Sequence, residues 1–162
     1  MSCVSTAVKR ASEMLFGTDR TALRRTFAQA WQHHLQGVPL EPLQAQIVKV
    51  VAEHPEYHRT VEDADALDRD YLPEGGQSNP FLHMAMHLAL LEQCANDRPS
   101  GISKAMARAQ RRSTSSHETQ HQAMECLGRV LWEAQAEARA PDEGSYLRCV
   151  QSLTKRARRT PK

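Results

Sequence analysis

The stretch NPFLHMAMHLALLEQC, residues 79–94, decides the fold of this chain. Pro80 suits the first position of a helix, and the apolar pattern predicts that this helix continues to about Asp97. Apolar side chains lie on nearly all of its faces, which is typical of a central helix enclosed by others. His83 and His87 lie one turn apart on the same side. The stretch therefore predicts a helical core that contains two histidines.

The composition of the 162 residues favours an all-helical protein. Aromatic residues make up 5%, which is low for a β-sandwich, whereas Ala, Leu, Gln, Glu and Arg are abundant. The length suits one domain with a buried core. We expect a single compact bundle of about five to seven helices. It should occupy residues 17–153, between an N-terminal extension over 1–16 and a basic mobile tail over 154–162.

Charge and cysteine content narrow the cellular setting. The net charge is only +2, so no strong overall field draws the chain to nucleic acid or membrane. No apolar run approaches the roughly 18 to 20 residues of a membrane span, and the N-terminus lacks the apolar region of a signal peptide. The four cysteines show no C-x-x-C spacing. We therefore expect reduced thiols in a cytoplasmic protein, with Cys94 and Cys126 as small core residues.

Start and stop signals place helices along most of the rest of the chain. Prolines at first helical positions, serine caps and glycine stops indicate their ends. The segment PEGGQS, residues 73–78, is expected to be a plain loop, because it lacks the G-K-[ST] element of a phosphate loop. The expected helices cover about residues 19–36, 42–54, part of 60–72, 100–112, 115–139 and the segment after Pro141.

Helical spacing assigns core-facing stripes to two of these helices. The stripe of the helix after Pro42 comprises Leu43, Ile47, Val48 and Val51. The stripe of the helix over 115–139 comprises His117, His121, Met124, Gly128, Leu131 and Trp132. The histidines of the long helix thus continue a line of predicted core residues.

Six of the eight histidines fall in pairs four residues apart. Random placement of eight histidines over 162 positions would give roughly 0.3 such pairs. On a helix, side chains four residues apart lie about 6 Å from each other, close enough for two imidazoles to hold one ion. A buried imidazole needs partners for its donor and its acceptor, and a metal ion supplies one of them. The pairs are His54/His58, His83/His87 and His117/His121.

The leading hypothesis is a transition-metal site in the core of the bundle. Its core ligands are His83, His87, His117 and His121, with His54, His58 and Glu125 as additional or second-site ligands. Imidazoles with a carboxylate suit Zn, Fe, Ni or Cu, and the sequence does not choose among them. A structural role and a redox or hydrolytic role both stay open, as does whether the protein is an enzyme. The competing interpretations are hydrogen-bonded core histidines, histidines on a solvated rim and a pH switch.

Known metal motifs match only in part. The segment HETQH, residues 117–121, has the H-E-x-x-H form of zinc proteases, but no histidine follows His121. Glu118 is better explained by a capping box with Ser115. A carboxylate-bridged di-iron bundle needs two E-x-x-H copies, and this chain has one. Hemerythrin-like spacings occur at His83/His87 and His121/Glu125, in a different order along the chain.

A second hypothesis from a different class is a non-enzymatic interaction module that contacts RNA or an acidic protein. Its basis is a basic helix face followed, near the end of the chain, by a basic tail, since phosphate contacts need such side chains. No aromatic-rich basic platform for stacking bases is visible, and an ordinary solvated surface would show the same pattern. The residues are Lys104, Arg108, Arg111, Arg112, Lys155, Arg156, Arg158, Arg159 and Lys162.

Several segments together resemble a bacterial protein family known only as a domain of unknown function. They are HPEYH, LPEGGQSNPFLHMAMHLALLEQ, DRPSGI, HQAMECLGRVLWEAQ and APDEGSYL, and the resemblance covers roughly Phe16 to Leu153. It implies a small cytoplasmic helical protein of Gram-negative bacteria and brings no activity with it. All the paired histidines except His117 fall within the resembling segments.

Overall fold

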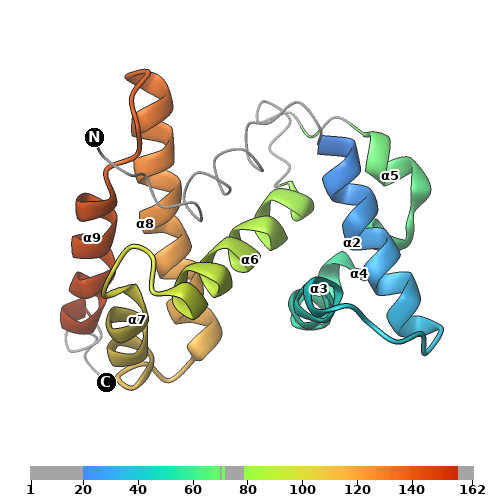
Figure 1. Cartoon of the computed structure of the whole chain (residues 1–162), viewed down its shortest axis with the longest axis horizontal. Helices are drawn as coiled ribbons and strands as arrows, with labels where there is room; N and C mark the ends of the chain where they lie inside the picture. The colour runs from blue at the N-terminus through green and yellow to red at the C-terminus, as the bar shows by residue number, and fades with distance from the viewer. Residues whose placement is uncertain (1–19, 70, 72–78, 157–162) are drawn as a thin grey trace. The chain divides into compact units, whose positions relative to one another are not determined.

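A computed structural model describes residues 20–69, 71 and 79–156 of the chain (Figure 1). All regular structure within these residues is helical, which confirms the predicted fold class. The predicted extension over 1–16, the loop over 73–78 and tail residues 157–162 lie outside the described residues. The helices are α2 (Arg20–Leu35), α3 (Pro42–Ala52), the 3-10 turn η1 (Pro55–Tyr57), α4 (His58–Glu62), α5 (Ala64–Asp68), α6 (Pro80–Asn96), α7 (Ile102–Gln110), α8 (Ser116–Ala136) and α9 (Glu143–Arg156).

The described residues form two compact units, 20–88 and 89–156. Helices α2 to α5 and the first half of α6 belong to the earlier unit, and the second half of α6 with α7 to α9 belongs to the later one. The predicted helix ends agree closely with the observed ones, because Pro42, Pro80 and Gly37 act locally as expected. None of the helices that the structure describes is both long and apolar enough to cross a membrane.

The earlier unit is built around α2, which packs against α3, α4 and α5. Phe27 on α2 is fully buried and meets Phe81 of α6 edge to face, with ring centroids 6.3 Å apart. The indole nitrogen of Trp31 donates to Glu62 Oε1 at 2.9 Å, which ties α2 to α4. This packing fixes the start of α6 relative to α3 and α4.

A buried arginine strengthens the same unit. Arg24 is only 6% exposed, and its Nη1 donates to the carbonyls of Leu67 and Arg69, each at 2.8 Å. Its guanidinium also lies 5.1 Å from the ring centre of Tyr71 and 5.6 Å from that of Phe81. Carbonyl acceptors and aromatic faces together compensate a buried cation, so Arg24 joins α2 to the end of α5.

The later unit packs α7, α8 and α9 against one another. Its buried polar contact is the Tyr146 hydroxyl, which donates to Gln93 Oε1 at 2.6 Å. Both side chains are fully buried, and burial raises the pKa of Tyr146. The bond connects α9 to the second half of α6.

The cysteine prediction was wrong for one pair. Cys126 of α8 and Cys149 of α9 form a disulfide, with Cα atoms 5.8 Å apart. Packing of the two helices brings these thiols together, although 23 positions separate them in the sequence. Cys94 is free, and burial together with Asp97 raises the pKa of its thiol to about 11. At neutral pH it is therefore a protonated thiol, as expected of a small packing residue.

Two predicted core positions were also wrong. Leu43 is 57% exposed, whereas Ile47, Val48 and Val51 of the same stripe are buried. Trp132 is 67% exposed. The buried face of α8 comprises Thr119, Ala123, Met124, Cys126, Leu127, Val130, Leu131 and Ala134. That face is centred about a third of a turn away from the predicted stripe, which followed the two histidines instead of the small and branched apolar residues.

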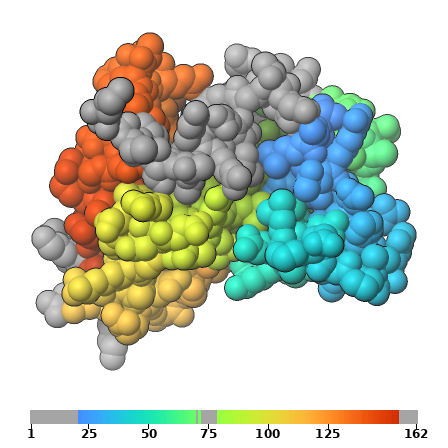
Figure 2. All heavy atoms as spheres, viewed as in Figure 1, coloured from blue at the N-terminus to red at the C-terminus, as the bar shows by residue number. Residues whose placement is uncertain are grey.

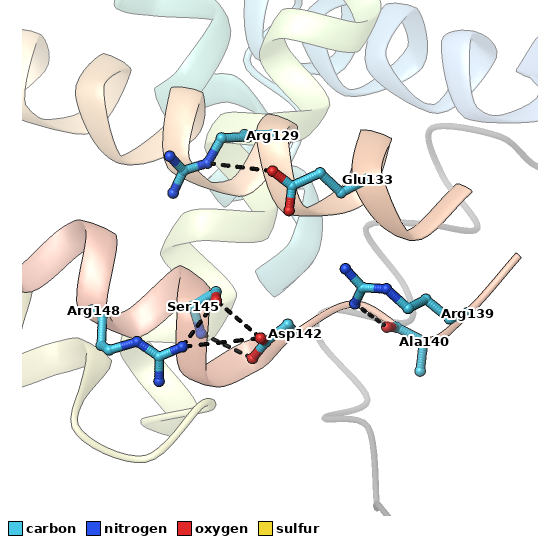
Figure 3. A network of polar contacts seen from close by, with 7 residues as sticks. All are labelled: Arg129, Glu133, Arg139, Ala140, Asp142, Ser145 and Arg148. Atoms are coloured by element: carbon cyan, nitrogen blue, oxygen red, sulfur yellow. Dashed lines mark hydrogen bonds and ion pairs between the residues drawn. The ribbon is translucent and has the colours of Figure 1, made fainter. Parts of the chain in front are cut away.

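Aspartates organise the starts of α7 and α9. Asp97, at a positive φ of 47°, accepts from the backbone nitrogens of Gly101 and Ser103. Asp142 accepts from the backbone nitrogen of Ser145 at 2.9 Å and from its hydroxyl at 2.9 Å, next to Arg148 (Figure 3). Bonds from these backbone nitrogens are the main reason that the pKa of each carboxyl is lowered. The carboxylate forms therefore stabilise the later unit.

Acid should remove this stabilisation. A carboxyl group whose pKa is lowered by folding stabilises the folded protein when the pH is above the ordinary aspartate pKa of about 3.9. This stabilisation disappears as the pH falls through the pKa of the folded state. We expect Asp97→Asn with Asp142→Asn to melt below the wild type at pH 7. The difference should shrink as the pH falls below about 4. Thermal melts followed by circular dichroism from pH 7 to 2.5 test this, with Asp68→Asn as a control for loss of a surface charge.

Loss of the disulfide should destabilise the protein. Opening a cross-link over 23 positions is expected to cost about 3 kcal/mol in the chain-entropy description. We expect Cys126→Ser with Cys149→Ser to lower the free energy of unfolding by that amount, and a reductant to do the same to the wild type. Urea unfolding measures both, with Cys94→Ser as the matched control. A urea unfolding midpoint of the wild type that does not change with reductant would contradict the disulfide.

Candidate metal centre

The start of α6 presents two histidines. Asn79 Oδ1 accepts from the backbone nitrogen of Leu82 at 3.1 Å, which caps the helix, and Pro80 occupies its first position. His83 and His87 follow in the first two turns, with ring centroids 5.0 Å apart. His87 is 1% exposed and His83 is half-buried. The sequence predicted this arrangement from local signals alone.

A third histidine reaches the same place from a different element. His54 lies between α3 and η1 with φ −127° and ψ 68°, outside the helical region, because it precedes Pro55. Its side chain is 1% exposed. His54 Nδ1 donates to the carbonyl of Val50 at 2.7 Å. This bond and the proline together fix the direction in which the imidazole points.

The Nε2 atoms of these three histidines converge. His83 Nε2 lies 3.2 Å from His54 Nε2 and 3.3 Å from His87 Nε2. The ligand atoms of the three residues all lie within 4.8 Å of one another. The rings meet at interplanar angles of 60° to 77°, so they approach a common point from different directions. We call His54, His83 and His87 the histidine cluster.

Linear hydrogen bonds among the three nitrogens account for only one of the two close contacts. A carbonyl only accepts, so His54 Nδ1 carries a hydrogen, and Nε2 of the neutral ring has a lone pair. His83 Nε2 has either one hydrogen or one lone pair. With a hydrogen it can donate to His54 but cannot accept from His87, and with a lone pair it faces the lone pair of His54. In either case, only one of these two contacts can therefore be a linear hydrogen bond between the nitrogens.

A single metal ion could be bound by all three nitrogens at once. Two nitrogens that each lie 2.0–2.1 Å from a tetrahedral zinc ion are about 3.3 Å apart. The observed separations of 3.2 and 3.3 Å from His83 Nε2 match this value. The Val50 carbonyl holds His54 in the tautomer that offers Nε2 to an ion, as carbonyls and carboxylates do at many metal centres.

Tyr57 and Val50 are neighbours of the cluster that the sequence did not single out. The Tyr57 ring stacks on His54 with centroids 5.6 Å apart and an interplanar angle of 6°. It also meets the edge of His83 at 5.7 Å. Tyr57 lies in HPEYH three residues after His54, and Val50 lies four residues before it. The spacing could have suggested both, but only the fold shows what they contact.

His58, the partner of His54 in the sequence pair, lies elsewhere. Its Nε2 donates to the carbonyl of Val51 at 2.9 Å, and its ring packs against Trp31 with centroids 4.5 Å apart. The 3-10 turn between the two histidines separates their directions, because the residues are not four apart on one α-helix. The unpaired positions His33 and His34 of α2 lie outside this cluster, where His33 is half-buried and His34 is exposed.

The remaining predicted ligands belong to α8 in the later unit. His117 and His121 are half-buried, and their ring centroids lie 4.3 Å apart on one side of the helix. Glu125 is exposed. The predicted site combines this pair with His83 and His87 of the earlier unit. Because this prediction concerns the placement of one unit relative to the other, it stays a prediction.

The predicted basic face is exposed where the structure describes it. All four basic side chains of the α7 region are exposed, at positions 104, 108, 111 and 112. Helix α9 reaches Arg156 and so includes the first residues of the predicted tail. The side chains of Lys155 and Arg156, and all of Arg158, Arg159 and Lys162, lie outside the described part.

Comparison with known proteins gives a family and no activity. Residues 19–152 match the family described as a domain of unknown function, DUF1841. No curated protein and no solved structure matches the chain. The chemistry of the histidine cluster therefore has to be inferred from its own geometry.

The two histidines of HPEYH should occupy opposite neutral tautomers. We expect His54 to carry its hydrogen on Nδ1 and His58 on Nε2, because each donates to a backbone carbonyl. Long-range ¹H–¹⁵N correlation spectra of metal-free protein with labelled histidine, at pH 8, distinguish the two forms. Substitution of His54 or His58 by Gln assigns the signals. The same tautomer at both positions would contradict this arrangement.

Proposed function

We propose that this chain, which belongs to the DUF1841 family of unknown function, binds a transition-metal ion through His54, His83 and His87. The observation that carries the proposal is that His83 Nε2 lies at metal-ligand spacing from the Nε2 atoms of both His54 and His87. Nitrogen ligands without a thiolate suit Zn, Fe, Ni or Cu. The proposal concerns binding, and no substrate or reaction is part of it.

The fourth ligand decides what the ion can do. Four protein ligands make a closed structural centre, whereas three leave a position for water, whose pKa the ion then lowers. The sequence predicts His121 as a further ligand, and we retain it as part of the proposal. A variant at this position separates the structural role from the hydrolytic or redox role.

Metal content is the direct test. Protein prepared without a histidine tag should contain about one equivalent of metal per chain by plasma mass spectrometry. His83→Ala with His87→Ala should reduce that content to near zero. His33→Ala with His34→Ala removes the same number of imidazoles outside the cluster and should keep the metal. His54→Ala should weaken binding at least about 10-fold, since it removes a ligand.

Stability gives an independent measurement. Zinc added to chelated protein at about 100 times its dissociation constant should raise the free energy of unfolding by about 2.7 kcal/mol. The His83/His87 variant should show no such increase, and circular dichroism of the two metal-free forms is the control that the variant is folded. Metal far below one equivalent in the wild type, or equal uptake by both double variants, would exclude the cluster as the site. Unchanged metal affinity in His121→Ala would leave the three-histidine centre with an open position.

A further inference from the structure

Positive charge is concentrated in one part of the later unit. From Arg98 to His117 the chain has five Lys and Arg residues and no Asp or Glu. The rest of the chain has 16 Lys and Arg against 19 Asp and Glu, so it is slightly acidic. The net charge of +2 therefore conceals a strongly basic segment. In Figure 2, yellow to light-orange atoms of this part of the chain lie at the surface of the face shown.

Helix α7 aligns these charges. Lys104, Arg108 and Arg112 are spaced four apart, and Arg111 lies beside them, all exposed. The opposite side of α7 is buried through Ile102, Ala105, Met106 and Ala109. A rise of 1.5 Å per residue spreads the four basic residues over about 12 Å. We call them the basic stripe.

The side chains of the basic stripe are available to a ligand. None of the four forms an ion pair with another residue in the described part of the chain. The backbone nitrogens at the start of α7 are different, because Asp97 already accepts from Gly101 and Ser103. An anion would therefore meet the side chains of the stripe and not the helix N-terminus.

We propose that the basic stripe binds the phosphate backbone of a nucleic-acid duplex. Three of its four residues are arginines, whose planar fork matches phosphate oxygens. No exposed large apolar side chain lies between residues 98 and 116, all of which the structure describes. A membrane-binding helix needs an apolar face, and a protein interface usually has an apolar or aromatic anchor, so both fit this surface less well.

The same composition determines the kind of binding. The segment has no Phe, Tyr or Trp to stack on bases, so binding does not favour unpaired strands or particular sequences. A duplex has one phosphate charge per about 1.7 Å, so 12 Å of stripe is long enough for four contacts. Four contacts predict a salt slope of about −3.6, which is a loss of about 150-fold in affinity between 50 and 200 mM salt.

Fluorescence anisotropy with the full chain tests the proposal. The probes are a labelled 20-base-pair DNA duplex, an RNA duplex of the same sequence and a scrambled version of each, in 50 to 200 mM salt. We expect micromolar affinity at 50 mM salt and equal affinity for scrambled sequences. The ratio of DNA to RNA affinity identifies which duplex is the better ligand. A dissociation constant above about 1 mM for both duplexes would overturn the proposal.

A charge-matched control separates the stripe from overall charge. The test variant replaces all four residues of the basic stripe by Gln. The control variant replaces four exposed basic residues of the earlier unit by Gln, namely Arg25, Lys49, Arg59 and Arg69. The test variant should bind at least about 10-fold more weakly, with a flattened salt slope, and the control should stay within about threefold. Equal weakening in both variants, or none in the test variant, refutes the stripe. Tighter binding to polyglutamate or to anionic vesicles than to duplex would also refute it.

Discussion

The bond between His54 Nδ1 and the Val50 carbonyl is the constraint on which the histidine cluster depends. It fixes the tautomer of a buried ring and directs Nε2 towards His83 and His87. The ring cannot turn away, because Pro55 sets the backbone and Tyr57 stacks on its face. Without this bond, Nε2 could carry the hydrogen and would no longer offer a lone pair. The cluster is therefore organised by α3 and η1 as much as by α6, which supplies two of its three nitrogens.

Packing in the earlier unit keeps α6 in reach of His54. Phe81 lies two residues before His83 and is held between Phe27 and the guanidinium of Arg24. The same arginine binds two carbonyls near the end of α5, so α2, α5 and the start of α6 form one arrangement. A shift of α6 by one turn would move its histidines about 5.4 Å, well beyond contact with His54. Apolar and cation–aromatic packing thus sets a distance that a metal centre requires to within a few tenths of an ångström.

Much of the fold could be predicted from local signals, and part of the cluster could not. Helix α6 was predicted closely because Pro80 and an apolar run act within a few residues. The i, i+4 rule placed His83 and His87 together for the same reason. It does not describe His54 and His58, since a 3-10 turn intervenes and, of the two, His54 contacts α6. The Cys126–Cys149 bond was missed because helix pairing, and not spacing, brings its thiols together. Trp132 shows that a large apolar residue on a helix need not face the core.

The histidine cluster and the basic stripe of α7 obey opposite physical requirements. The proposed metal binding needs burial, since a low local dielectric strengthens the interaction of an ion with converging nitrogen ligands. The proposed duplex binding needs exposure, because the basic side chains must reach the phosphates and displace the counterions condensed on the duplex. Salt should therefore weaken duplex binding strongly and leave metal binding nearly unchanged, whereas a chelator should do the reverse. Since the cluster lies in residues 54–87 and the stripe in residues 104–112, neither proposal depends on the other. An effect of metal on duplex affinity would instead show that the two units are coupled. Metal would then change the affinity for duplex by the same factor as duplex changes the affinity for metal.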